Sequence, residues 1–85
     1  MSQVEFFRSV FPLADGRQVE ASCFLAGRVL RLSATLVDAD FVIRRSHRGV
    51  YLYDSQTWVR DIEAFTTEFE AVAGVDLPWT LLPAP

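Results

Sequence analysis

The sequence predicts an α+β fold, with a single antiparallel β-meander of four to five strands followed by one C-terminal amphipathic helix packed on one face, in two layers. In the first half of the chain, apolar residues alternate with polar ones in short segments separated by turn residues, which is typical of hairpin-connected strands. Between Asp54 and Gly74 the apolar residues recur in steps of four and three, which is typical of a helix. With 85 residues, of which 51% are hydrophobic, the chain is expected to form one domain covering residues 1–85.

The strands are placed by their alternation and by the turns between them. Asp15-Gly16 and Ala26-Gly27 are expected to close the first two turns, because glycine tolerates positive φ. A turn at 37–40 and a final hairpin around 46–49, with Gly49 as its positive-φ residue, complete the pattern. The predicted strands cover roughly residues 4–13, 18–25, 28–37, 41–46 and 50–54.

The first predicted strand is apolar on both of its alternating faces. Val4, Phe6 and Val10 share one face, and Phe7 and Phe11 share the other. We therefore expect this strand to be covered on both sides or to lie at an interface. The third strand alternates more strictly, because every second residue from Leu30 to Leu36 is apolar and the residues between are polar or charged. That regular face is the expected surface for the helix.

The helix is predicted over roughly residues 55–73. Asp54 or Ser55 is the expected N-cap, and Gly74 is the expected left-handed residue after the last turn. Its apolar stripe is expected to be buried against the sheet, since a helix of this length is only marginally stable alone in water. The stripe consists of Trp58, Ile62, Phe65, Phe69 and Val72.

The apolar C-terminal tail, residues 75–85, needs a surface to cover it. Leu77, Trp79, Leu81 and Leu82 would be an aggregation hazard if they were exposed together. Two placements remain open. The tail lies along an edge or the open face of its own sheet, or it docks on a second subunit.

Composition and charge exclude several classes of protein. Only 22% of residues are charged and the net charge is −3, which argues against a disordered tail and makes nucleic acid a poor partner. Cys23, as the only cysteine, forms no internal disulfide and is expected to be a small buried residue. No apolar run is long enough for a membrane span, and no secretory signal pattern is present, so we expect a cytoplasmic protein without a membrane partner.

One cluster has chemical character, the arginine-rich stretch at 44–48. At a hairpin tip, its basic side chains are placed to hold a phosphate or carboxylate, and the neighbouring tyrosines add aromatic surface for stacking. The alternative interpretation is that the basic residues are solvated surface charges without a ligand, and that the tyrosines belong to a half-buried sheet. The candidate residues for an anion or nucleic acid are Arg44, Arg45, His47, Arg48, Tyr51 and Tyr53.

No motif in the sequence indicates catalysis, a metal or a cofactor. Asp38 and Asp40 share a turn but lack further ligands. His47 and Cys23 are each the only residue of their type, so a nucleophile with its base requires distant elements to meet. We therefore expect no enzymatic activity, no metal site and no cofactor.

The sequence favours a small non-enzymatic protein–protein interaction module. The partner is expected to be a second copy in a homodimer, or a macromolecule bound in the manner of inhibitor, immunity or antitoxin proteins, which this chain matches in size and composition only. The alternative is a domain that binds an anion, a nucleotide or nucleic acid through the 44–48 hairpin. The interface candidates are Phe7, Phe11, Trp79, Leu81 and Leu82.

Overall fold

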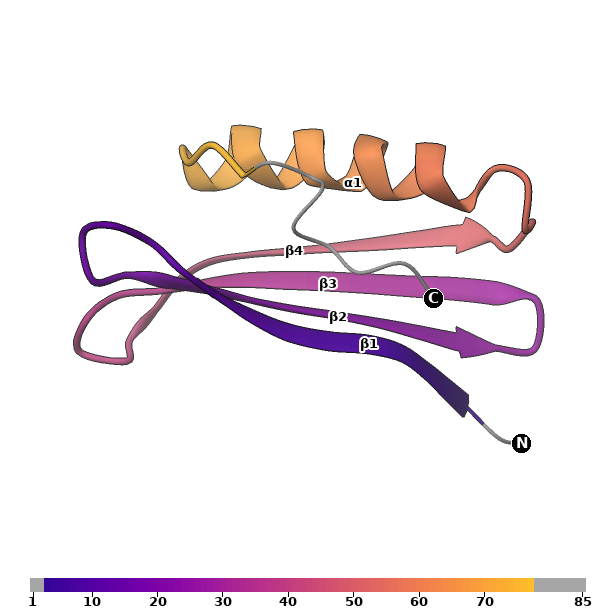
Figure 1. The fold of residues 1–85 in the computed structure, drawn as a ribbon, viewed down its shortest axis with the longest axis horizontal. Helices are drawn as coiled ribbons and strands as arrows, with labels where there is room; N and C mark the ends of the chain where they lie inside the picture. The colour runs from indigo at the N-terminus through magenta and orange to yellow at the C-terminus, as the bar shows by residue number, and fades with distance from the viewer. Residues whose placement is uncertain (1–2, 78–85) are drawn as a thin grey trace.

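The computed structural model describes residues 3–77 and confirms the α+β class. One helix lies along a four-stranded antiparallel sheet, beside its last strand (Figure 1). In chain order the elements are β1 (Gln3–Pro12), β2 (Gln18–Ala26), β3 (Val29–Val37), β4 (Ile43–Leu52) and α1 (Trp58–Ala73).

The sheet is a simple meander in the order β1-β2-β3-β4, so β1 and β4 are its edges. The first two predicted turns are confirmed. Gly16 and Gly27 close them with φ of 89° and 63°, values that suit glycine because it has no Cβ. Asp15 supports the first turn by accepting a hydrogen bond from the backbone N–H of Arg17.

The core lies between α1 and one face of the sheet. Leu30, Leu32, Ala34 and Leu36 of β3 are buried on this face, as their alternation predicts. Cys23 of β2 pairs with Leu32 and is also fully buried, and this burial raises the pKa of its thiol to about 12. Every second residue of β2 and β3 therefore faces the helix, and the residues between lie on the opposite face, which we call the helix-free face.

The helix packs mainly against β4 and to a smaller extent against β3. Ile62, Phe65 and Phe69 are buried as predicted. Val72 is 44% exposed, so its assignment to the buried stripe was wrong. Thr66 is buried in addition, and its hydroxyl has no hydrogen-bond partner among the residues described.

The two ends of α1 differ in how well the sequence predicts them. Gly74 is left-handed, with φ of 69°, and donates a hydrogen bond to the carbonyl of Glu70, as expected of a helix C-cap. The N-cap prediction was wrong, because the helix begins at Trp58 with Thr57 before it. Asp54 instead shapes the preceding turn, where its carboxylate accepts a hydrogen bond from the N–H of Gln56.

A β-bulge in β1 changes which residues share a face. The pairing with β2 shifts between Glu5 and Phe7, so Phe6 is the extra residue. As a result both Phe6 and Phe7 pack toward the core, and the ring of Phe6 meets that of Tyr53 edge-on at 5.4 Å. Val10 lies 55% exposed on the other face, so the predicted grouping of Phe6 with Val10 was wrong.

The predicted hairpin at 46–49 is also wrong, because β4 runs without interruption through this segment. The presence of a glycine at position 49 is explained by side-chain packing. A Cβ on this residue would lie 2.7 Å from Cε2 of Tyr51 and 2.9 Å from Cδ1 of Phe65. Gly49 is therefore required for the close approach of the helix to β4, and not for a turn.

Candidate functional site

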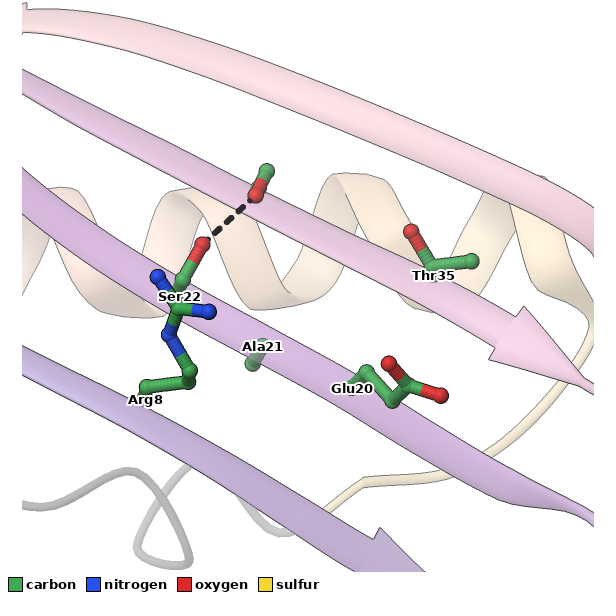
Figure 2. A pocket seen from close by; sticks show the side chains of 6 residues that line it. Arg8, Glu20, Ala21, Ser22 and Thr35 are labelled. Carbon is green, nitrogen blue, oxygen red and sulfur yellow. Dashed lines mark hydrogen bonds between the residues drawn. The ribbon is translucent and has the colours of Figure 1, made fainter.

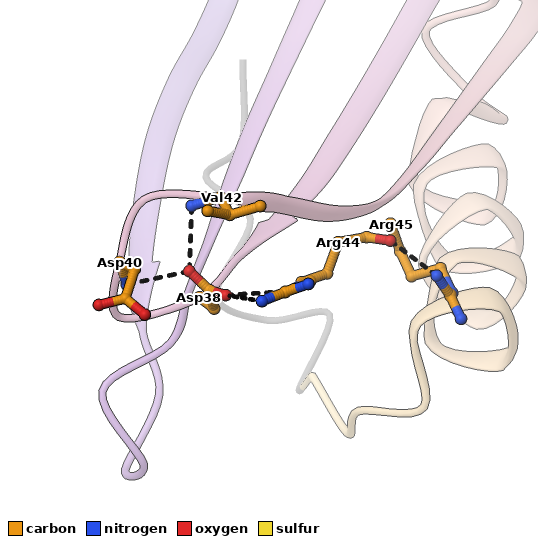
Figure 3. A network of polar contacts seen from close by, with 5 residues as sticks. All are labelled: Asp38, Asp40, Val42, Arg44 and Arg45. Carbon is orange, nitrogen blue, oxygen red and sulfur yellow. Dashed lines mark hydrogen bonds and ion pairs between the residues drawn. The ribbon is translucent and has the colours of Figure 1, made fainter.

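The most unusual local geometry of the described chain is in the loop between β3 and β4. Asp38 organises it from within (Figure 3): its Oδ1 accepts hydrogen bonds from the N–H groups of Asp40 and Val42, at 2.9 and 3.0 Å. Its Oδ2 forms an ion pair with Arg44, at 2.6 Å from Nη2 and 2.7 Å from Nε. These bonds stabilise the carboxylate, so the pKa of Asp38 is lowered, first by the Val42 N–H and then by Arg44.

Phe41 stands at the end of the turn in this loop. Its N–H donates to the carbonyl of Asp38, and its φ is 64°, the only positive φ of a non-glycine residue among residues 3–77. Glycine is the usual residue at such a position, because a side chain in the left-handed region costs about 1–2 kcal/mol. The loop therefore holds a phenylalanine where local energetics favour glycine.

The side chain of Phe41 gains almost no burial in return. It is 79% exposed, and the next two residues, Val42 and Ile43, are 46% and 65% exposed. We call these three residues the Phe41 tip. The three side chains are exposed apolar groups on a loop whose backbone is held by hydrogen bonds to the Asp38 carboxylate, which also pairs with Arg44.

The predicted arginine cluster does not converge on a single site. Arg44 is held by Asp38, while Nη1 of Arg45 donates a hydrogen bond to the carbonyl of Arg44 at 2.8 Å. His47 turns to the helix, where it hydrogen-bonds Glu68 at 2.9 Å and stacks on Phe65.

Arg48 takes a separate direction, because it pairs with Ser33 on the helix-free face. Without a hairpin at 46–49, the four basic residues of the cluster lie in three different environments: the loop before β4, the helix side of the sheet and the helix-free face.

The two tyrosines belong to the helix side of β4. Tyr51 and Tyr53 are half-buried against the core and do not form a surface beside Arg48. Burial raises the pKa of Tyr51, and the negative charges of Glu68 and Asp61 raise it further. Their aromatic rings therefore contribute to packing in this structure.

The helix-free face carries a polar row that crosses all four strands. Arg8, Ser22, Ser33 and Arg48 are successive partners in the sheet register. The two serine hydroxyls hydrogen-bond each other at 2.8 Å, next to Arg8, in a shallow pocket of about 200 Å³ (Figure 2). Sequence patterns did not single out this row, because it exists only once the register of four strands is known.

The interface candidates have different positions. Phe7 is buried in the core and Phe11 packs against it, so neither presents an open surface on the single chain. Trp79, Leu81 and Leu82 lie outside the described residues. Phe41 was missed, because its place in an apolar segment gave it the pattern of a strand residue. The one available signal was its position directly after Asp38-Ala39-Asp40, a turn-forming stretch.

The fold and its loops define a small α+β domain of meander type. No protein-family model matches the chain, and neither a curated protein sequence nor a solved structure is significantly similar to it. Within residues 3–77, no helix is both long and apolar enough to cross a membrane. Nor do these residues bring together three or more potential metal ligands.

Proposed function

We propose that this chain is a protein–protein interaction module, rather than an enzyme, and that the Phe41 tip is its anchor. The observation that carries the proposal is the combination of positive φ, 79% exposure and a fixed backbone at Phe41. Strained positions persist where surrounding structure holds them, and they concentrate at binding sites. Because the ring of Phe41 is exposed, its burial within the chain does not offset the cost of the positive φ.

The chemistry of the tip suits an apolar pocket on a partner protein. Aromatic side chains that insert into such pockets supply much of the binding free energy at protein interfaces. Rigidity adds to this, because a loop already fixed by Asp38 loses little conformational entropy on binding. Val42 and Ile43 extend the apolar contact along the start of β4, which is an edge of the sheet.

The partner is either a second copy of the chain or another macromolecule, and solution mass separates the two. Light scattering that gives twice the chain mass identifies a homodimer. A single-chain mass directs the search to another protein, retained from an extract of the native cell by the immobilised domain.

The discriminating variant is Phe41→Gly, which removes the anchor and relieves the strain. We expect it to abolish dimerisation or retention of the partner, while the free energy of unfolding stays unchanged or rises by up to about 1 kcal/mol. Val10→Ser is the matched control, since Val10 is an exposed apolar residue at the other edge of the sheet. If Phe41→Gly keeps both the solution mass and the retained proteins of the wild type, the proposal is wrong.

A further inference from the structure

The helix-free face has a second feature that the Phe41 tip does not explain, a pair of arginines on neighbouring strands. Arg48 pairs with Ser33, and Arg31 lies two residues before Ser33 on β3. The two arginines are therefore diagonal neighbours on one face, with Ser33 beside both. Diagonal neighbours in an antiparallel pair are about 7–8 Å apart, within reach of long side chains.

This part of the face is hollowed. A pocket of about 360 Å³ is lined by Arg31, Ser33, Arg48, Phe24 and Val50, together with backbone neighbours of β3 and β4. The smaller pocket in Figure 2 adjoins it, since Ser33 lines both. The result is a continuous shallow depression over the middle strands.

Among the described residues, three arginines (Arg8, Arg31 and Arg48) line this depression, against one carboxylate, that of Glu20 at its far end. Arg8, at its β1 side, is paired with Glu5 at 2.8 Å and lies over the ring of Phe24 at 5.7 Å. Within residues 3–77, neither Arg31 nor Arg48 has a carboxylate at ion-pair distance. As diagonal neighbours, these two guanidinium groups can both reach an anion placed between them.

We infer that this depression binds a phosphate monoester of a flat organic group, with the phosphate between Arg31 and Arg48 and the organic group against Phe24 and Val50. Two guanidinium forks and the Ser33 hydroxyl offer five donors between them, whereas the two oxygens of a carboxylate accept about four hydrogen bonds. A tetrahedral phosphate has enough oxygens for all three groups.

A small ligand fits the charge distribution better than a nucleic acid polymer. The chain carries a net charge of −3, and a polyanion needs a broad excess of basic residues for its counterion-driven affinity. The adenine nucleotide adenosine 5′-monophosphate is a suitable probe, since it joins a phosphate to a flat ring system. Inorganic phosphate, adenosine and single-stranded oligothymidine are the comparison ligands.

The test is a titration of the full chain with each ligand at low salt, monitored by NMR. Saturable binding of adenosine monophosphate is expected, with shifts of the Ser22 and Ser33 amides. Arg31→Gln and Arg48→Gln should each weaken it at least about tenfold, the effect of losing one charge-assisted contact. Arg60→Gln makes the same charge change on the exposed side of α1 and should bind as the wild type does.

Several results would overturn the inference. These are no saturable binding at millimolar nucleotide, unchanged affinity in both arginine variants, or tighter binding of inorganic phosphate than of the nucleotide. If the oligonucleotide bound more tightly than adenosine monophosphate, with a steep salt dependence, the ligand of this face would be a nucleic acid polymer and the inference would be wrong. Both arginines are exposed, so the variants are expected to fold, and circular dichroism checks this. Phe41→Gly should retain wild-type nucleotide affinity, which separates this site from the Phe41 tip.

Discussion

Gly49→Ala tests how closely the helix packs on β4. An added Cβ would lie 2.9 Å from Cδ1 of Phe65 and 2.7 Å from Cε2 of Tyr51, where carbon atoms normally keep about 3.5–4.0 Å. Tyr51 is half-buried and its ring can swing outward, but Phe65 is only 2% exposed and is enclosed by the core. The contact with Phe65 therefore determines the cost.

The expected loss of unfolding free energy is about 0.5–2 kcal/mol. Overpacking of a core costs about 1–3 kcal/mol, and replacing glycine within a strand returns about 0.5–1 kcal/mol. Urea denaturation followed by circular dichroism measures the difference. If Gly49 were needed for a turn, the cost of Gly49→Ala would not depend on the side chain at position 65. If it is needed for packing, the cost should depend on that side chain.

A double-mutant cycle with Phe65→Leu makes the test specific. The smaller side chain gives the new methyl group room, so Gly49→Ala should cost about 1 kcal/mol less in this background. Gly27→Ala is the matched control. It strains a residue with φ of 63° but meets no atom within 4 Å, so its cost should be the same in both backgrounds. Additivity of Gly49→Ala with Phe65→Leu would refute the packing explanation.

Two further substitutions test single polar groups. Thr66→Val should raise the free energy of unfolding by about 1 kcal/mol in urea denaturation, because it removes a buried hydroxyl that has no partner within residues 3–77; a decrease would contradict this. Asp38→Asn should destabilise the chain at neutral pH, and the gap to the wild type should close in acid. The folded pKa of Asp38 is lowered, so its stabilising effect is present above the unfolded pKa and is lost as pH falls through the folded pKa. A gap independent of pH, measured from urea midpoints, would show that the carboxylate's charge does not stabilise the loop.

Local patterns were sufficient for an antiparallel meander followed by one helix, for the core face of β3 and for the end of α1. Leu30 to Leu36 alternate with polar residues, and this pattern has one consistent placement on a half-buried sheet. Gly74 ends the helix because a left-handed residue is needed there. These features depend on residues close together in the chain.

The errors come from contacts between residues far apart in the chain. Gly49 has the local pattern of a turn residue, yet a side chain there is disfavoured by the close approach of Phe65, sixteen positions later. The bulge at Phe6 likewise depends on pairing with β2, and it brings Phe6 to the core side of the sheet, beside Phe7.

The candidate site was the least predictable part for the same reason. The 44–48 cluster was expected at a hairpin tip, and its members separate once β4 is continuous. Arg48 instead joins Arg31 and Ser33, a grouping fixed by strand register. Phe41 has a positive φ that residue type alone argues against.

Photo-crosslinking from position 41 is the most direct test of the Phe41 tip as the anchor of an interface. A photoreactive phenylalanine analogue replaces Phe41 in one variant of the chain and Val10 in a second variant. Each variant is irradiated in the native cell. The account predicts a discrete crosslinked product from position 41, whose mass identifies a second copy or another protein, and none from position 10. Absence of a discrete product at position 41, or the same products from both positions, would contradict it.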